Sequence, residues 1–205
     1  MTRTLPFLCL CALLCGCAKK SRSTTAEPDS PLGIALGGAG SGEPKAVLPV
    51  RPALPAGWVE FKQPDGAFTV FLPASPRPKG MGGGGSLNQP LPAGRALMSD
   101  FAAQATGLYC EVGVAVFSPE LVDGVRTATE RKPVSGANGK RAQVTWAGHP
   151  AFEDTSGAAG PGQLEVKRWM WIGNRMYYVN LYGQAPDRPT AEERATVFDS
   201  FVVGK

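Results

Sequence analysis

The chain has 205 residues, with 21 lysines and arginines, 17 aspartates and glutamates, one histidine and five cysteines, and a formal net charge of +4. Six basic and three acidic residues lie before Gly57, so the rest of the chain is nearly neutral. This balance argues against a nucleic-acid-binding surface, which needs a basic patch or stripe. With one histidine, and Cys110 as the one cysteine after residue 17, a zinc site made of histidine and cysteine is excluded.

The first 17 residues, MTRTLPFLCLCALLCGC, hold four of the five cysteines. Arg3 precedes an apolar stretch of about ten residues, which is too short to span a membrane and is typical of an export signal. The stretch ends in Leu14-Cys15-Gly16-Cys17, which resembles the bacterial lipobox. That resemblance implies a signal peptide over residues 1–16, cleavage before Cys17 and a lipid on the Cys17 thiol. The alternative is an ordinary signal peptide rich in cysteine.

Residues 17–56 are rich in proline, glycine, serine and alanine and contain almost no aromatic residues. Such a segment cannot bury enough apolar surface to offset the entropy cost of ordering it. We expect a lipidated cysteine followed by a disordered tether, and then a single domain over residues 57–205, which is long enough to hold a core.

The domain opens with two short strands, around Val59 and Phe68, joined by a turn at Pro64-Asp65-Gly66. The next segment, residues 73–94, contains several prolines and a run of glycines, which predict no regular structure. It holds no aromatic residue, histidine or carboxylate, so we interpret it as a disordered loop rather than a binding loop.

Two further strands are predicted in RALMSDFAAQ and LYCEVGVAVF. In the second, Cys110 shares the apolar parity with Val112, Val114 and Val116, which predicts a buried thiol rather than a nucleophile. The next segment predicts a helix with Ser118 as N-cap, Pro119 in its first turn, and a face made by Leu121, Val125 and Ala128.

The next strand should place Ala142, Val144 and Trp146 on one face, before a turn at Gly148-His149-Pro150. His149 with Glu153 or Asp154 is the candidate acid–base pair of the chain. The competing interpretation, which we favour, is a histidine in a tight turn with no catalytic role.

Two segments rich in strand-forming residues flank Gly173-Asn174, which predicts a two-residue hairpin turn. Trp169 and Trp171 share one face of the first strand, and apolar residues occupy the other. This pattern indicates either a central strand covered on both sides or an exposed aromatic binding patch at Trp169 and Trp171.

The last element is a predicted helix capped by Thr190, with Glu193 as the partner in a capping box. Its buried stripe should comprise Ala191, Ala195, Phe198 and Phe201 or Val202.

Four stretches in this order, GWVEFKQPDGAFTVFLPASP, GHPAFE, IGNRMYYVNLYG and FDSF, resemble an exported lipoprotein domain abundant in planctomycete-type bacterial proteomes. That domain is similar in outline to the PsbP-like and DcrB-like α/β sandwich. The resemblance covers nearly all of residues 57–203 and implies an α+β fold, a curved antiparallel sheet with about two helices packed on it. It implies no catalytic residue.

These patterns together predict an envelope-anchored lipoprotein that is a non-enzymatic binding or structural module, without cofactor or metal. Its partners would be the membrane, through Cys17, and an envelope protein. The alternative is a hydrolase or transferase that uses His149 with Glu153 or Asp154.

Overall fold

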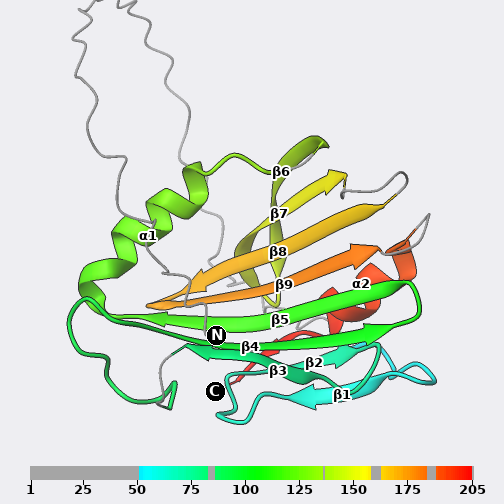
Figure 1. Ribbon diagram of the computed structural model, residues 1–205, viewed down its shortest axis with the longest axis horizontal. Coiled ribbons are helices and arrows are strands. Elements are labelled where there is room, and N and C mark those ends of the chain that lie inside the picture. The colour runs from blue at the N-terminus through cyan, green and yellow to red at the C-terminus, as the bar shows by residue number, and fades with distance from the viewer. Residues whose placement is uncertain (1–50, 83–85, 136, 158–162, 184–187, 205) are drawn as a thin grey trace, which may run out of the picture. The chain divides into compact units, whose positions relative to one another are not determined.

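The protein is represented by a computed structural model, which describes residues 51–82, 86–135, 137–157, 163–183 and 188–204 (Figure 1). The described residues form an α+β fold in which every strand pairing is antiparallel. The predicted signal peptide, Cys17 and the tether as far as residue 50 lie outside these residues.

A seven-stranded sheet dominates the fold, with the strand order β3-β4-β5-β9-β8-β7-β6. It consists of two meanders that meet where β5 pairs with β9. Helix α1 connects β5, in the middle of the sheet, to β6 at its edge (Figure 1). The bounds are β3 Arg77–Gly82, β4 Ala96–Ala105, β5 Leu108–Phe117, α1 Pro119–Arg131, β6 Ala137–Trp146, β7 His149–Gly157, β8 Leu164–Ile172 and β9 Arg175–Gly183.

A smaller sheet has the order β1-β2-β10, with β1 Val59–Lys62, β2 Phe68–Leu72 and β10 Val202–Val203. The predicted first hairpin is therefore confirmed, and the last residues of the chain add a third strand to it. Helix α2, Ala191–Ser200, leads directly into β10.

The core lies between the small sheet with α2 and one face of the large sheet, which we call the inner face. Phe201 shows this arrangement, because its ring packs against Phe68 of the small sheet and against Trp146 and Tyr177 of the large one. The Trp146 indole N–H donates to the Phe198 carbonyl at 2.8 Å. Cys110 is fully buried on the same face, as its parity predicts.

Both predicted hairpin turns of the second meander exist, but one is shifted. Gly173 and Asn174 form the expected two-residue turn, with Gly173 at φ +58°. The turn predicted at residues 148–150 is instead Ala147-Gly148, where both residues have positive φ. His149 therefore begins β7, paired with Trp146. A type I′ turn requires positive φ at both central positions, and Ala147 gives no sequence signal for it.

The prediction that residues 73–94 have no regular structure is wrong for Arg77–Gly82, which forms β3. This strand pairs only with β4, with a register shift between Pro78 and Gly80. An edge strand tolerates proline, because its outward N–H needs no partner in the sheet, so the proline there did not prevent pairing. Beyond residues 83–85, which are not described, Leu87 is buried and its N–H donates to the Asp65 carboxylate.

The capping box of α2 is confirmed, since Thr190 accepts from the Glu193 N–H and Glu193 accepts from the Thr190 N–H. Its buried stripe differs from the prediction. Phe198 and Phe201 are buried as expected, whereas Ala191, Ala195 and Val202 are exposed. Thr196, Val197 and Ser200 take their places. Hydrogen bonding makes the burial of Ser200 inexpensive, because its hydroxyl accepts from the Phe71 N–H and donates to the Val197 carbonyl.

The domain begins earlier than Gly57, because Arg51 already packs on it. The Arg51 guanidinium lies 4.4 Å from the centre of the Phe71 ring, donates to the Ser200 carbonyl and pairs with Glu60. The predicted tether is thus too long at its C-terminal end.

Helix α1 has the predicted start but not the predicted face. It begins at Pro119, yet the Ser118 hydroxyl accepts from the Gly94 N–H instead of capping the helix. No residue of α1 is buried; Leu121 and Val125 are partly exposed and Ala128 is exposed. Apolar burial therefore contributes little to holding this helix, and polar contacts to the large sheet must replace it.

Candidate functional site

The face of the large sheet opposite the core, which we call the outer face, carries a row of polar residues in register. Glu111 of β5, Asn180 of β9, Lys167 of β8, Asp154 of β7 and Arg141 of β6 are successive cross-strand partners. Strand side chains alternate between the two faces, so these five lie side by side. We call them the polar row.

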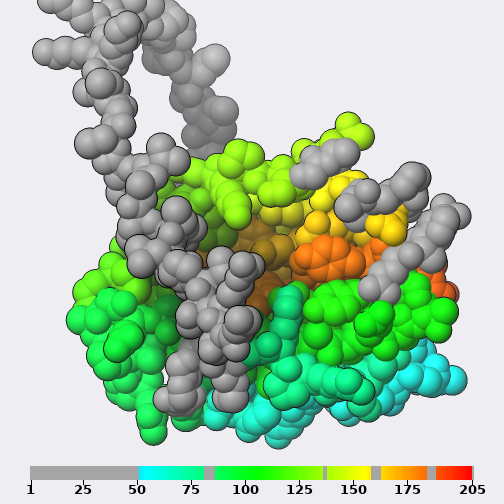
Figure 2. Space-filling view, in the orientation of Figure 1, coloured from blue at the N-terminus to red at the C-terminus, as the bar shows by residue number. Residues whose placement is uncertain are grey.

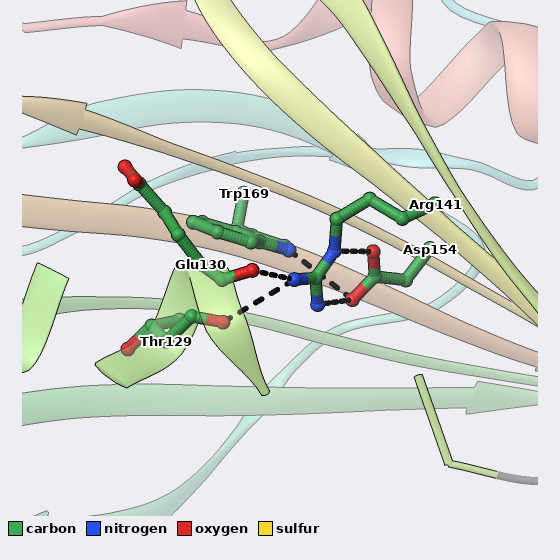
Figure 3. Close-up of polar contacts among 5 residues, drawn as sticks. All are labelled: Thr129, Glu130, Arg141, Asp154 and Trp169. Carbon is green, nitrogen blue, oxygen red and sulfur yellow. Dashed lines mark hydrogen bonds and ion pairs between the residues drawn. The ribbon is translucent and has the colours of Figure 1, made fainter. Parts of the chain in front are cut away.

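Arg141 ends the row and ties α1 to the sheet (Figure 3). Its Nε and Nη2 donate to the two Asp154 oxygens at 2.6 and 2.7 Å, a bidentate ion pair. Its Nη1 donates to the carbonyls of Thr129 and Glu130, in the last turn of α1. These carbonyls lack partners within the helix, and a positive charge there is favoured by the helix dipole. The Arg141 side chain thus fixes the end of a helix that has no fully buried residue.

Trp169 lies beneath this contact and is 1% exposed. Its ring stacks on Phe152 with centroids 4.5 Å apart, its indole N–H points to Asp154, and the Arg141 guanidinium lies 5.1 Å from its centre. Trp171 is half-buried between Phe117 and Arg126. The predicted aromatic binding patch is therefore wrong for Trp169. The other interpretation, a central strand covered on both sides, holds at Trp169 but not along the whole strand, because Trp171 and Lys167 on the same face are partly exposed.

Lys167 occupies the middle of the polar row. Burial lowers its pKa, and the repulsion from Lys132 adds to that, against the attraction of Asp154 and Glu165. Among the described residues no carboxylate lies within ion-pair distance of its ammonium group; the nearest aromatic contact is the Tyr178 ring, 5.5 Å from Nζ to the ring centre. A largely buried cation without a contacting counter-ion is costly.

Asn180, the neighbour of Lys167 across the strands, is 8% exposed. Its amide nitrogen donates to the Tyr182 hydroxyl at 2.7 Å and to Glu165 Oε1 at 3.2 Å. Burial and the nearby Glu165 raise the pKa of Tyr182. The Asn180 Oδ1 atom is buried and accepts no hydrogen bond from the described part of the chain. A buried acceptor in this state needs an explanation such as a ligand or water.

A cavity of about 250 Å³ opens above these groups, which we call the outer hollow. Its floor is formed by β7, β8 and β9, and one wall by the end of α1 and the residues after it. In Figure 2 the face is hollowed over β8 and β9. The lining residues on which the chemistry depends are Lys132, Asp154, Glu165, Lys167, Asn180 and Tyr182.

A second polar cluster lies beside the row, across β4, β5 and β9. The Tyr178 hydroxyl donates to the Asp100 carboxylate by reaching over Gly113, which stands between them in the register. A Cβ atom at Gly113 would overlap both side chains. Burial raises the pKa of Asp100, and the Tyr178 bond opposes that shift. Lys79 pairs with Glu111 at 2.6 Å nearby. Because glycine has no side chain, Tyr178 can reach Asp100 across position 113.

The candidate acid–base residues are not brought together. His149 and Glu153 are four residues apart on β7, which separates them by about 13 Å along a strand. Asp154 points to the opposite face from both. Glu153 pairs with Arg168 at 2.7 Å, and Asp154 is held by Arg141. Each of these acids has an arginine as its partner. Glu153 is too far along the strand to contact His149, and Asp154 lies on the other face.

Cys110 does not have the properties of a reactive thiol, because it is fully buried and burial raises its pKa. Within the described ranges, no group of three or more histidine, cysteine, aspartate or glutamate side chains could hold a metal ion. No helix in the same ranges is long and apolar enough to cross a membrane. Cys17 lies outside them.

Sequence reasoning overlooked the polar row, although a signal for it was present. Glu165 and Lys167 have the same parity on β8 as Trp169 and Trp171, so they share a face with them. Charged residues that share a face of a strand with aromatic residues are the signal for a polar site on that face.

Comparison of the sequence with protein-family models and with curated proteins finds no match to either. The site must therefore be interpreted from its own geometry.

Proposed function

We propose that this protein is an exported lipoprotein, anchored to a membrane through a lipidated Cys17, whose α+β domain is a non-enzymatic binding module facing the periplasm or the cell surface. The observation that supports the anchor is the string Leu14-Cys15-Gly16-Cys17, placed directly after a short apolar stretch that follows Arg3. The domain would be similar to the PsbP-like and DcrB-like sandwich, a likeness based on the sequence motifs. An envelope protein is a further expected partner.

The binding role is supported by the outer hollow. Within the part of the chain that the structure describes, it combines an ammonium group without a contacting carboxylate and a buried acceptor without a donor, at Lys167 and Asn180. A few polar groups converging on a concave site are typical of small-molecule sites. Catalysis has less support, because the two candidate acids, Glu153 and Asp154, are each paired with an arginine and not with His149.

The length of chain between Cys17 and Arg51 suits such a role. If the 34 residues from one to the other are the tether that the composition predicts, their typical span is roughly 30–35 Å, at about 5–6 Å times the square root of the length. That reach would let the domain meet soluble ligands away from the lipid surface.

Metabolic labelling with a clickable palmitate analogue tests the anchor. The wild-type chain should be labelled, and Cys17→Ser should not be. Cys15→Ser is the matched control, because the lipobox tolerates a small polar residue at that place and the acceptor thiol is kept. Equal labelling of wild type and Cys17→Ser, or loss of label in Cys15→Ser alone, would contradict the assignment of Cys17.

A further inference from the structure

We propose that the outer hollow binds a free α-amino acid, with the ligand carboxylate against Lys167 and the ligand ammonium group against Asn180 Oδ1 and Glu165. The proposal rests on the binding role argued above and names the ligand of that same site. Three properties of the hollow lead to it: an unmatched cation and an unmatched acceptor among the described residues, and their places on neighbouring strands.

The ammonium group of Lys167 favours an anionic group on the ligand. Burial and the neighbouring Lys132 both disfavour the charged form of Lys167, and among the described residues no carboxylate contacts it. Asp154 makes its ion pair with Arg141 and not with Lys167. A ligand carboxylate placed between Lys167 and Lys132 would neutralise this charge in a site where hydrogen bonds to ions are strong.

The Asn180 Oδ1 atom favours a hydrogen-bond donor on the ligand. Both amide hydrogens of Asn180 are used, on Tyr182 and Glu165, so its orientation is fixed and Oδ1 is the end left without a partner. The adjacent Glu165 carboxylate carries a negative charge that no arginine or lysine contacts in the described residues. A cationic donor therefore fits this corner better than a neutral one.

The positions of Lys167 and Asn180 and the size of the cavity favour a compact zwitterion, of which an α-amino acid is the simplest. Lys167 and Asn180 are direct cross-strand partners, and the Cβ atoms of such partners lie about 4.5–5.5 Å apart. A ligand with its anionic and cationic groups close together, as the carboxylate and ammonium of an α-amino acid are, can therefore meet both side chains. A cavity of about 250 Å³ is below the range of ~300–1,000 Å³ typical of drug-sized ligands, which favours a small molecule.

Equilibrium dialysis of the full-length chain in detergent tests the ligand class. The probe is a mixture of the common L-amino acids, all radiolabelled. We expect retention of one or more of them with a Kd below about 1 mM, a modest affinity for a small polar ligand. The best-retained amino acid is then compared with its α-hydroxy analogue and with its carboxamide, each of which should bind at least about tenfold more weakly because one charged contact is lost.

The site is tested with Lys167→Met, which keeps the length of the side chain and removes its charge, and with Asn180→Leu. Lys140→Met is the control, because Lys140 is exposed on β6 and does not line the hollow. Lys167→Met should weaken retention about tenfold or more without lowering the melting temperature, and Lys140→Met should change neither.

Retention of no amino acid by the wild type, or equal retention by Lys167→Met, overturns the proposal. If the α-hydroxy analogue binds as tightly as the amino acid, Glu165 does not recognise an ammonium group and the assigned ligand class is wrong. The palmitate experiment is independent of these outcomes. A labelled Cys17 without amino-acid binding leaves the anchor intact and removes the ligand, and the reverse result does the opposite.

Discussion

On β8, Val166 and Met170 point to the inner face and are fully buried, whereas Lys167 and Trp169, the neighbours of these two residues along the strand, point to the outer face. The two faces of one sheet thus differ in how they are held. Helix α2 covers the inner face through buried phenylalanines, while α1 is fastened to the outer face by the polar contacts of Arg141 and Arg126. Apolar burial on one side leaves the other side free to carry charges around a cavity.

If the inner face holds the fold, truncating it should have the largest effect. Phe198 is 1% exposed, packs edge-on against Trp146 and lies under the Arg168 guanidinium. We expect Phe198→Ala to lower the free energy of unfolding by about 3–5 kcal/mol, from lost burial plus a cavity. Urea denaturation measures this loss, and His149→Ala should leave the curve almost unchanged. A wild-type curve for Phe198→Ala would mean that α2 is not docked.

Breaking the fastening of α1 should have the next largest effect. Arg141→Met leaves Asp154 without its cation and the last carbonyls of α1 without a donor. The side chains of this pair are 19% and 14% exposed, so we expect a loss of about 2–3 kcal/mol, less than the 3–5 kcal/mol of a fully buried pair.

Hydrogen exchange should report this change as faster exchange in α1, with β5 and β9 still protected. The double variant Arg141→Met/Asp154→Leu should recover part of the loss, because it leaves no unpaired charge. Uniform acceleration through the whole sheet would show that the two faces are not held separately.

Two glycine substitutions on the outer side should act in opposite directions. Gly113→Ala should cost about 1–3 kcal/mol, because the added methyl overlaps Asp100 and Tyr178. Gly124→Ala, in the middle of α1 with open space around it, should stabilise by about 0.5–1 kcal/mol. Thermal melting of both variants gives the comparison. Two shifts of the same sign would contradict the packing described at Gly113.

The smallest effect is expected at Lys167, and it depends on pH. Burial lowers its pKa in the folded state, so the unfolded chain binds more protons at pH values between that lowered pKa and the ordinary lysine value of 10.5. Lysine at this position therefore costs stability at neutral pH, and the cost is relieved as the pH rises through this window.

Lys167→Met removes that cost. The variant should melt at the same temperature as wild type or slightly higher near neutrality, and the difference should shrink at alkaline pH. Melting curves across this range measure it. A variant clearly less stable at neutral pH would show that the Lys167 ammonium group stabilises the fold, contrary to this expectation.

The local features of the fold could be predicted from sequence because each depends on neighbouring residues. The Gly173-Asn174 turn, the Thr190–Glu193 capping box and the buried Cys110 follow from spacing and parity. The turn at Ala147-Gly148 could not be found in this way, because alanine carries no preference for positive φ. Nor could β3, whose prolines are tolerated only because it lies at an edge of the sheet.

The candidate site could not be assembled from sequence because it depends on strand order. Asp154, Lys167 and Asn180 become neighbours only once β7, β8 and β9 are placed side by side in register. Glu111 joins them through the β5–β9 pairing, which no hairpin signal predicts. That Asn180 Oδ1 is buried without a hydrogen-bond donor in the described residues follows only from the three-dimensional arrangement around it.

The pairing of β5 with β9 also has a consequence for how the chain folds. Within each meander every strand pairs with the next one along the chain, but Leu108 and Gly183 are partners 75 residues apart. Distant contacts of this kind slow folding, since a long loop must close before they form. During synthesis β5 is completed long before β9, so the edge of β5 that pairs with β9 stays open in the meantime. An open edge on an apolar strand promotes aggregation. We expect the seam to form last, which low φ-values for Val112→Ala and Val179→Ala in folding kinetics would reveal.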